Sequence, residues 1–536
     1  MLATVFSRGQ LGMEAPEVTI DVHLSEGLPT MTLVGLPEAA VKESRERVRS
    51  AVINAGFEWP PGRITINLAP ADLPKEGGRF DLPIALCLLA ADGRIPGRAV
   101  AAYELYGELS LGGELRAVPG ILSAVVRATQ QGRPVIVPRA NLQEAQFVIG
   151  ARIVSAANLS EVIGHVRGVR PLPVAEGSAP AREAAAQYPD LTDVCGQARA
   201  CRALEIAAAG SHSVLMVGPP GSGKSMLAQR LPGLLPPLTP AEALEAAMIA
   251  SANPCGFRPE SWSRRPFRSP HHTASAVALV GGGSLPVPGE ISLAHHGVLF
   301  LDELVEFAPE ALEALREPLE NGRITVSRAA RQVEFPARFQ LAAAMNPCPC
   351  GHFGDGTARC RCGELRIERY QGRLSGPLLD RLDLQVRITP VEPAALERGS
   401  GRAERSAMVA GRVVSAREAQ LRRQGVLNAA LDNAGVGQHC VLGEEARCQL
   451  RRAAEQLRLS GRAYYRVLRV ARTIADLSGA EGISARAVAE AVSFRALDLY
   501  RVASPRGARS YLRAGEGATQ WLEREGLRPP AASSRQ

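Results

Sequence analysis

Residues 211–231 read SHSVLMVGPPGSGKSMLAQRL. An apolar run leads here into a G-x-x-x-x-G-K-S turn, and a helix-forming stretch follows the turn. A strand, a glycine-rich loop and a helix in this order form the cradle that holds the phosphates of a bound nucleotide. The segment therefore predicts a nucleoside triphosphate site in an α/β core, with ATP and Mg²⁺ as the expected cofactors.

The residue types of this turn suit phosphate binding. Glycines let backbone N–H groups close around phosphates, and a helix that begins near Lys224 directs the positive end of its dipole toward them. We expect Lys224 to reach the β- and γ-phosphates and Ser225 to give Mg²⁺ a hydroxyl ligand. Lysine is otherwise found only at Lys42 and Lys75, among 62 basic residues, so its presence here is informative. The nucleotide-binding residues predicted in the turn are Gly218, Pro219, Pro220, Gly221, Ser222, Gly223, Lys224 and Ser225.

Two further apolar runs are predicted to be strands that end in catalytic side chains. Residues 297–304 read GVLFLDEL and residues 339–346 read FQLAAAMN. Asp302 would hold Mg²⁺ through water, Glu303 would orient and deprotonate the attacking water, and Asn346 would bridge that water and the γ-phosphate. Alone, a carboxylate pair is often a solvated strand end and an Asn before Pro a turn. The phosphate loop upstream favours the catalytic interpretation.

Two arginines are candidates for the neutralisation of charge in the transition state. Residues 375–386 read SGPLLDRLDLQV, in which Arg381 is predicted to act as an arginine finger in the site of a neighbouring subunit. An ordinary salt bridge is the alternative. Arg462 begins a helical segment and is predicted to contact the γ-phosphate, with Arg466 as the alternative one turn later. Arg466 and Arg469 would equally suit a solvated helix face.

A chain of 536 residues is long for one hydrophobic core, so several domains are expected. Short β-like runs alternate with helical stretches at the start, a Pro/Ala/Gly/Ser-rich stretch follows, and an apolar stripe of helical spacing runs from Ala463 to Leu477. The predicted division is an α/β domain at 1–170, a linker at 171–190, a nucleotide-binding core with a parallel sheet at 191–390, a helical lid at 391–505 and a flexible tail at 506–536.

The composition is that of a soluble globular protein, with 46% apolar and 22% charged residues. The first residues lack the features of a signal peptide, and the most apolar stretch, Leu82–Ala91, is too short to cross a bilayer. We therefore expect a cytoplasmic location and no membrane partner. The net charge of +8 permits nucleic-acid binding without requiring it.

Four cysteines crowd into one short segment as two C-x-C pairs, and adjacent histidines lie elsewhere. The pairs are Cys348 with Cys350 and Cys360 with Cys362, and four thiolates suit a structural, tetrahedral Zn²⁺. Free thiols are the alternative, because the spacing is tighter than the usual C-x-x-C. Neighbouring side chains on a strand or helix point apart, so His271 and His272 are given no catalytic role.

Four stretches together resemble one family. They are GPPGSGKS at 218–225, RSPHHTASAVALVGGGSLPVPGEISLAHHGVLFLDEL at 268–304, AAAMNPCPCG at 342–351 and SGPLLDRLDL at 375–384. The chain resembles the magnesium-chelatase-like AAA+ ATPases, specifically the ComM (YifB) family, over nearly its whole length. The resemblance implies a hexameric ring ATPase that acts on single-stranded and branched DNA as a branch-migration helicase during natural transformation, with recombination proteins as possible partners.

The resemblance also directs attention to a predicted hairpin. Residues 321–335 read NGRITVSRAARQVEF, two β-like arms around a basic tip. In related ring motors a hairpin at this position projects into the central pore, so Arg328 and Arg331 are the predicted contacts to DNA phosphates. A solvent-exposed turn is the alternative. A glycine-rich segment, Ala274–Glu290, is predicted to be a flexible loop near the pore.

The first domain resembles the Lon-protease fold through residues 69–89 and 106–124. Where such a protease carries its nucleophilic serine this chain reads Gly78-Arg79-Phe80-Asp81, and where the lysine base belongs it reads Leu122-Ser123-Ala124. Without a nucleophile and a base there is no covalent proteolysis. We therefore expect a non-proteolytic domain for assembly or DNA binding.

The leading interpretation is an ATP-driven DNA motor. Two alternatives remain at this point: the motor subunit of a metal-chelatase-type complex, and a scaffold that uses nucleotide binding only for assembly.

Overall fold

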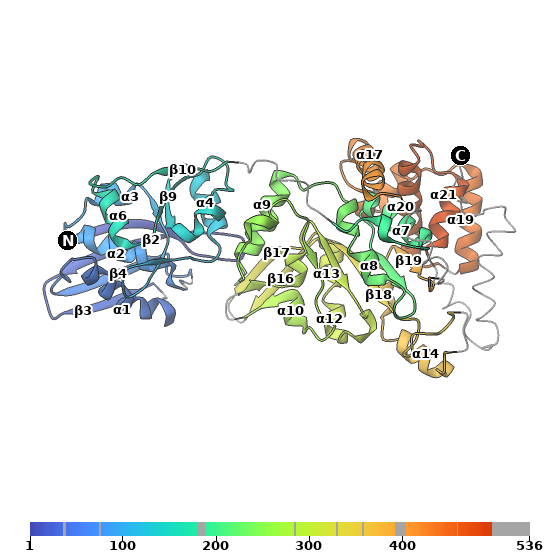
Figure 1. Ribbon diagram of the computed structural model, residues 1–536, viewed down its shortest axis with the longest axis horizontal. Coiled ribbons are helices and arrows are strands. Elements are labelled where there is room, and N and C mark those ends of the chain that lie inside the picture. The colour runs from blue at the N-terminus through green and yellow to red at the C-terminus, as the bar shows by residue number, and fades with distance from the viewer. Residues whose placement is uncertain are drawn as a thin grey trace.

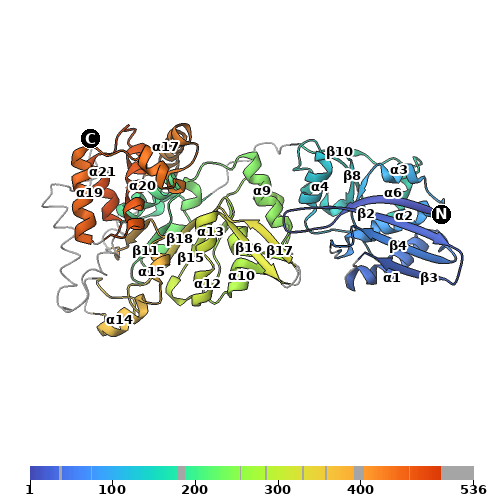
Figure 2. The ribbon, with the colours of Figure 1, turned by 180° about the vertical axis from the view of Figure 1, so that it is seen from behind.

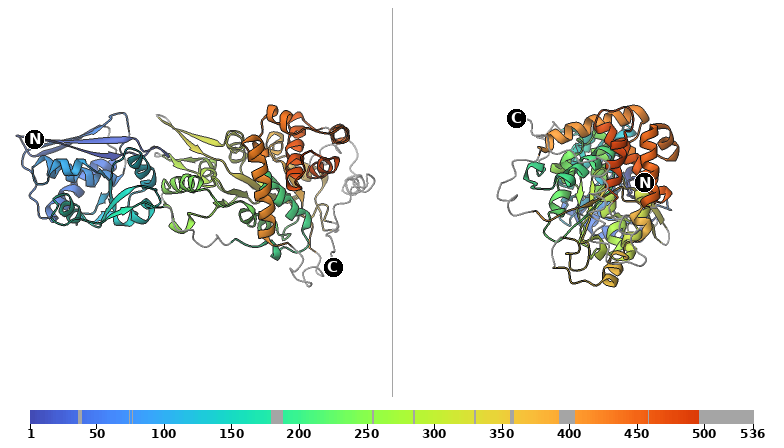
Figure 3. Two further views of the ribbon diagram at one scale, coloured as in Figure 1. Left: turned by 90° about the horizontal axis from the view of Figure 1, so that it is seen from above. Right: turned by 90° about the vertical axis from the view of Figure 1, so that its right-hand side faces the viewer.

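The computed structural model describes residues 1–495 except 36–38, 74, 76, 179–187, 254, 284–285, 329–330, 356–358, 392–403 and 458. The molecule is elongated, with the N-terminal α/β domain at one end, a second α/β domain in the middle and C-terminal helices at the other end (Figure 1). The view from behind and the view from above show the same succession (Figures 2 and 3). Within the described residues, no helix is both long and apolar enough to cross a membrane.

The N-terminal domain is built on an eight-stranded sheet of order β10-β9-β8-β5-β1-β2-β4-β3. The buried helix α2 contacts β1 and β2, which explains why the most apolar stretch of the chain lies there. The strands are β1 (Leu2–Arg8), β2 (Glu17–Ser25), β3 (Thr30–Val34), β4 (Arg63–Ala69), β5 (Glu104–Leu105), β8 (Val135–Pro138), β9 (Arg152–Ala156) and β10 (Val174–Glu176), with β6 (Glu108–Leu109) and β7 (Leu115–Arg116) as a separate pair. The helices are α1 (Ala39–Asn54), α2 (Asp81–Ala91), α3 (Gly97–Ala101), α4 (Ile121–Gln130), α5 (Leu142–Ala145) and α6 (Leu159–Val166).

The middle domain contains a five-stranded sheet of order β12-β15-β18-β11-β19, in which every pairing is parallel. Three of its strands are buried at every position, as expected for a sheet covered on both faces. Because parallel strands end at one edge, the residues after β11, β15 and β18 meet there. The strands are β11 (Val214–Val217), β12 (Phe267–Arg268), β15 (Val298–Leu301), β18 (Gln340–Met345) and β19 (Leu384–Arg387).

Helices and two small hairpins complete the middle domain. The hairpins are β13 (Gly281–Gly282) with β14 (Val287–Pro288), and β16 (Arg323–Arg328) with β17 (Arg331–Pro336). The helices are α7 (Ala198–Gly210), α8 (Lys224–Ala228), α9 (Pro240–Ser251), α10 (Ala276–Val280), α11 (Glu290–Leu293), α12 (Pro309–Glu313), α13 (Arg316–Asn321), α14 (Glu364–Gln371) and α15 (Gly376–Leu379). The segment predicted as a flexible loop, Ala274–Glu290, therefore contains α10, β13 and β14, and this prediction was wrong.

The C-terminal helices pack on the middle domain through α7, which contacts both α17 and α20. The apolar stripe of α20 is buried in one continuous core with α7 and β11, and the Ser460 hydroxyl caps the helix by accepting a hydrogen bond from Ala463 N. The helices are α17 (Ser406–Gln424), α18 (Asn433–His439), α19 (Glu444–Leu457), α20 (Gly461–Leu477) and α21 (Ala485–Ser493). The predicted tail at 506–536 lies outside the described residues.

The predicted linker at 171–190 is only partly irregular. Val174–Glu176 forms the edge strand β10, which pairs antiparallel with β9 through three residues. The Pro and Ala content of the stretch obscured this strand, because edge strands tolerate residues that a central strand excludes. The stretch thus begins by completing the N-terminal sheet.

The N-terminal and middle domains share an apolar contact. The Phe147 ring stacks on the Trp262 ring with centroids 4.5 Å apart, and α4 contacts α9. A second contact lies at the turn after β1, where Leu11 and Met13 pack against the core that contains Phe335 of β17. The N-terminal domain therefore touches the hairpin β16–β17 directly.

Candidate nucleotide-binding site

The phosphate loop lies between β11 and α8, as the order strand, loop, helix predicts. Gly221 and Gly223 have φ angles of 73° and 87°, in the left-handed region that favours glycine. Ser222 supports the turn, because its Oγ donates a hydrogen bond to the Pro219 carbonyl over 2.8 Å. The glycines and this hydrogen bond thus help to fix the loop conformation.

Lys224 lies folded into this loop. Its Nζ donates to the carbonyl oxygens of Gly218 and Pro219, both over 2.8 Å, and to Asn346 Oδ1 over 3.2 Å. Burial lowers the pKa of Lys224, and the carboxylates of Asp302 and Glu303 act in the opposite direction. A buried ammonium held only by carbonyl and amide oxygens is well suited to an incoming anion.

Ser225 and Asp302 place two oxygen ligands side by side. The Ser225 Oγ donates to Asp302 Oδ2 over 2.6 Å, so the hydroxyl at the start of α8 meets the carboxylate at the end of β15. Oxygen donors in this arrangement fit Mg²⁺, which binds one or two protein oxygens and retains several waters. The residues present therefore fit the cation that the sequence predicted.

Glu303 occupies an unusual backbone position. Its φ is 52°, a left-handed conformation that is rare for a residue with a Cβ, and its N–H donates to Asp302 Oδ1 over 2.9 Å. Its half-exposed carboxylate contacts His272, with Oε2 lying 3.0 Å from Nδ1 of the imidazole. Backbone strain of this kind is concentrated at functional sites.

The expectation that the side chains of His271 and His272 point apart was wrong, and their lack of a catalytic role stays a prediction. Their ring centroids lie 4.2 Å apart, and His272 contacts the predicted base Glu303. Alternation applies within strands and helices, but the two histidines follow β12, in a loop. The signal that could have found His272 is that β12 neighbours β15, so the residues after both strands meet.

The two predicted arginines are placed differently from the residues at the phosphate loop. The guanidinium of Arg381 contacts Glu320 and donates to the Pro377 carbonyl. Within its own chain, Arg381 therefore forms the ordinary salt bridge that was the alternative to an arginine finger. Arg462 is exposed at the start of α20 and makes no hydrogen bond or ion pair within the described residues. Neither is brought to the phosphate loop of its own chain by a contact.

Arg466, the alternative to Arg462, joins the helical domain to the sheet. Its guanidinium pairs with Asp383 and donates to the Arg381 carbonyl over 3.0 Å. Arg466 therefore does not belong to a solvated helix face. Burial raises the pKa of Asp383, but Arg466 and the neighbouring His212 outweigh burial and hold it well below its usual range. The charged, buried Asp383 thus holds α20 through Arg466, and the same guanidinium contacts the backbone of Arg381, the candidate arginine finger.

The four cysteines gather into one cluster, with all four sulfurs within 4.8 Å of one another. The Sγ atom of Cys348 lies 3.3 Å from that of Cys350 and 3.8 Å from that of Cys360. Four thiolates around Zn²⁺ at about 2.3 Å are separated by about 3.8 Å, so the donor set and its spacing fit the metal. Burial opposes ionisation of Cys350, yet hydrogen bonds from the His352 N–H and the other thiols lower its pKa to about 6.

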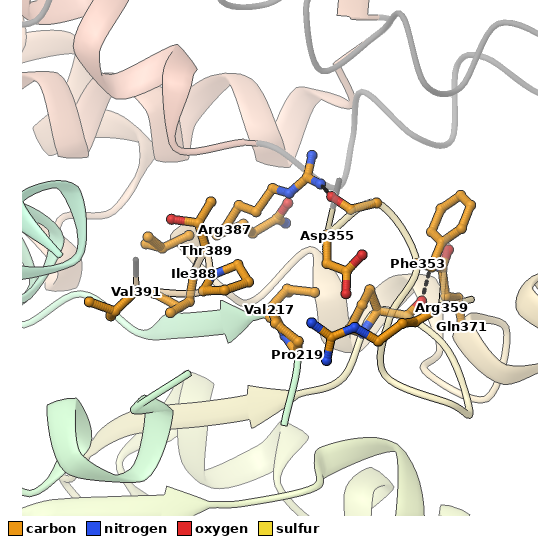
Figure 4. A pocket seen from close by; sticks show the side chains of 16 residues that line it. Val217, Pro219, Phe353, Asp355, Arg359, Gln371, Arg387, Ile388, Thr389 and Val391 are labelled. Atoms are coloured by element: carbon orange, nitrogen blue, oxygen red, sulfur yellow. Dashed lines mark hydrogen bonds between the residues drawn. The ribbon is translucent and has the colours of Figure 1, made fainter. Parts of the chain in front are cut away.

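Two cavities flank the phosphate loop. The larger, of about 590 Å³, lies between the start of the loop, the end of β19 and the segment Phe353, Gly354 and Asp355, with Asp355 and Arg359 pointing into it beside Pro219 (Figure 4). The smaller, of about 390 Å³, is lined by the loop from Pro219 to Gly223 and by Gln197 and His352. Both lie in the size range of ligand sites.

The predicted DNA-binding hairpin is present as β16 and β17, with Arg328 opposite Arg331 as the last pair before the tip. The positions of these two side chains lie outside the described residues. At the base of the hairpin, Arg323 forms an ion pair with Glu334 over 3.0 Å. The backbone thus carries the two arginines to the end of the hairpin, and their role stays a prediction.

The N-terminal domain has no nucleophile and base at the expected positions. Arg79, at the place of the serine, is buried and donates to Gln10 and to the Pro119 carbonyl. Leu122 is buried, and the buried Ser123 Oγ has no hydrogen-bond partner within the described residues. At these two positions the described residues thus place no hydroxyl beside a base, and the non-proteolytic character of the domain stays a prediction.

Known proteins are similar to this chain over more than nine tenths of its length. It is 50% identical over 499 residues to YifB of Salmonella typhimurium, an uncharacterised protein, and this match covers 93% of the chain and 97% of YifB. It is 48% identical over 501 residues to the competence protein ComM of Haemophilus influenzae, covering 92% and 98%. The chain belongs to the ComM (YifB) family of magnesium-chelatase-like AAA+ proteins.

Family models locate the likeness along the ComM (YifB) chain. The model described as magnesium chelatase, subunit ChlI, matches residues 190–396, which include the phosphate loop and the four cysteines. Subunit ChlI of Mg-chelatase matches residues 20–141, and the C-terminal part of subunit ChlI matches residues 403–495. The residues that converge at the carboxyl edge of the five-stranded sheet therefore lie in the part shared with magnesium chelatase.

Proposed function

We propose that this ComM (YifB) protein is a Mg·ATP-driven ring motor, a hexamer that moves branches in DNA during natural transformation. One observation carries the ATPase part of the proposal: Lys224, Ser225, Asp302 and Asn346 meet at one edge of the sheet through hydrogen bonds of 2.6 and 3.2 Å. The similarity to a protein named competence protein ComM supports the DNA part.

The proposed reaction divides the work among the residues of this edge. Lys224 would leave its carbonyl partners for the β- and γ-phosphates, and Ser225 and Asp302 would hold Mg²⁺, which neutralises phosphate charge when bound. Glu303 would accept a proton from the attacking water, and Asn346, already 3.2 Å from Lys224 Nζ, would orient that water. Arg381 of a neighbouring subunit would complete the site, since within its own chain it contacts Glu320.

The His272–Glu303 pair gives this proposal an off state. A carboxylate paired with an imidazole 3.0 Å away is held aside from the water it should activate. Nucleotide binding or DNA binding that releases this pair would free Glu303 to act as the base. In this proposal, the contact with His272 restrains hydrolysis, and His272 is not a ligand of Mg²⁺ or of the nucleotide.

The test compares ATP hydrolysis and unwinding of forked and three-stranded DNA by the wild type, Lys224→Ala and Glu303→Gln. We expect Lys224→Ala to lose ATP binding. Glu303→Gln should bind ATP but hydrolyse it about 10²- to 10⁴-fold more slowly, because its base is gone, and it should remain locked on DNA. A wild-type protein that hydrolyses ATP yet leaves forked and three-stranded DNA untouched would contradict the DNA motor.

The match to the magnesium chelatase models favours one second candidate, the motor subunit of a metal-chelatase-type complex. Such a motor requires a large partner that binds a porphyrin. Stable capture of a chelatase partner, with no DNA affinity at low salt, would favour this candidate over the DNA motor. A scaffold without catalysis would show no DNA-stimulated ATP hydrolysis at all.

A further inference from the structure

The loop that carries the four cysteines begins directly at the proposed catalytic edge. Asn346 directly follows β18, and Cys348 comes two residues later. The start of the loop is anchored by Gln371 of α14, whose Nε2 donates to the Pro347 carbonyl over 2.8 Å. We call the described residues of 347–362 the Cys loop. A metal bound by its cysteines would therefore fix the chain immediately after Asn346.

The Cys loop contacts the phosphate loop closely at one point. Gly351 has a φ of 81°, and its N–H donates to the Cys348 carbonyl over 2.9 Å in a tight turn. A Cβ on Gly351 would lie 2.4 Å from Cδ of Pro220, which is closer than any real contact. The turn inside the cysteine cluster thus lies directly against the phosphate loop.

The Cys loop also forms a wall of both cavities beside the phosphate loop. His352, Asp355 and Arg359 line the smaller cavity, and Asp355 and Arg359 also line the larger one (Figure 4). The wall is braced internally, since His352 Nδ1 lies 3.0 Å from Asp355 Oδ2, and externally by a hydrogen bond from Arg387 to the Gly354 carbonyl. The wall residues lie in the chain between the first and the second cysteine pair. Arg387, which braces them from outside, lies on β19.

We propose that the Cys loop is a metal-dependent wall of the nucleotide pocket, so that Zn²⁺ binding and nucleotide binding strengthen each other. The inference rests on the proposed function of the phosphate loop. Four thiolates tied to one ion remove conformational freedom from the loop, and an ordered wall no longer has to be fixed when the nucleotide binds. Linkage requires the coupling to be reciprocal, with the same factor in both directions.

The first experiment measures that reciprocity on the full-length chain. Zinc content is determined by metal analysis, zinc release is followed with a chromophoric chelator, and affinity is measured with a fluorescent ATP analogue. We expect about one zinc per chain, slower or weaker loss of zinc when the analogue is bound, and a roughly 5- to 100-fold weaker affinity after zinc removal, the usual size of a coupling. Cys360→Ser with Cys362→Ser should show the same loss, and Cys448→Ser, at an exposed free cysteine, should not.

A second pair of variants tests the contact without touching a metal ligand. Gly351→Ala should force the Cys loop away from Pro220, because its Cβ meets Pro220 Cδ at 2.4 Å. Gly363→Ala, with no heavy atom within 4 Å of its Cβ and no positive φ, is the matched control. We expect both variants to retain zinc and only Gly351→Ala to lose nucleotide affinity.

The outcomes separate this inference from the function on which it rests. If the wild type binds no nucleotide, the proposed ATPase fails. If the wild type binds and hydrolyses ATP, but contains no zinc or keeps its full affinity after zinc removal, the coupling is wrong and the ATPase stands. Full affinity in Gly351→Ala would show that the contact with Pro220 does not transmit the coupling, and would overturn the proposed wall.

Discussion

His295 is a buried histidine whose chemistry follows from its two hydrogen bonds. The Arg338 N–H donates to its Nδ1 over 2.9 Å, so Nε2 carries the ring proton and donates to Glu245 over 3.1 Å. Glu245, His295 and His296 lie close enough to hold a metal. The protonated Nε2 argues against that use, because a neutral imidazole binds metal through a free lone pair. The cluster joins α9 to the start of β15.

This residue makes stability depend on pH. Burial lowers the pKa of His295 to about 4, so the unfolded state binds more protons than the folded state between pH 4 and 6.5. Stability should therefore fall as the pH is lowered through that range, by roughly 2 kcal/mol between pH 7 and pH 5 for this group. In His295→Gln this part of the loss should vanish, whereas in His23→Gln, at an exposed position, it should remain. The free energy of unfolding of the wild type and of both variants is measured by calorimetry at pH 7 and pH 5. The same pH dependence in all three proteins would contradict this prediction.

The hairpin β16–β17 is held at its base from two sides. Ile324 and Phe335 are buried in the core of the middle domain, and the turn after β1 of the N-terminal domain packs on the same cluster. Gly12 lies so close that a Cβ there would meet Val333 at 2.5 Å. The turn after β1 therefore packs against the part of the hairpin that is buried in the core of the middle domain.

At the tip, replacing Arg328 and Arg331 by Ala should weaken DNA binding, and the effect should be largest at low salt. Removing one phosphate interaction makes the slope of log K against log salt shallower by about 0.7 to 0.9, because fewer counterions are released on binding. Nucleotide affinity should be unchanged. Arg323→Ala is the control, since Arg323 pairs with Glu334 on the same hairpin. Titrations of single-stranded DNA at several salt concentrations give the slopes, and an unchanged slope for the double variant would refute the phosphate contacts.

At the scale of the whole molecule, neither of the two arginines predicted to act in hydrolysis contacts the phosphate loop of its own chain. Arg381 is held by Glu320 and by the Pro377 carbonyl, and Arg462 is exposed to solvent. Within the described residues, neither side chain reaches the phosphate loop. The elongated arrangement places the N-terminal domain at one end and the C-terminal helices at the other, with the phosphate loop between them (Figure 1). A ring would supply the missing arginine from the neighbour.

Mixing two inactive variants tests this directly. Arg381→Ala should bind ATP but hydrolyse it at least about 10³-fold more slowly, as expected for the loss of an arginine finger. Combined at equal amounts with Lys224→Ala, it should recover up to about a quarter of the wild-type rate, since random rings contain interfaces with both residues intact. A finger that acts within its own chain would give no recovery in the same ATPase assay.

Much of the architecture could be predicted because it depends on local patterns. The apolar runs within 297–304 and 339–346 contain the strands β15 and β18, as predicted, because at least four consecutive apolar residues before polar ones fit a buried strand. The motif at 218–225 could also be predicted from a local pattern, since Gly221 and Gly223 adopt the positive φ angles that favour glycine. The edge strand β10 was missed, because its pairing with β9 lies outside any local window.

The sequence by itself determined the family, the phosphate loop and the identity of the residues that follow each strand, because these depend on residue type and spacing along the chain. Only the tertiary structure decided which of them meet. It paired His272 with Glu303 and set Gly351 against Pro220. The physical reason is that these contacts join segments from different strand ends, and strand order in a parallel sheet is fixed by packing between distant elements and not by any local pattern.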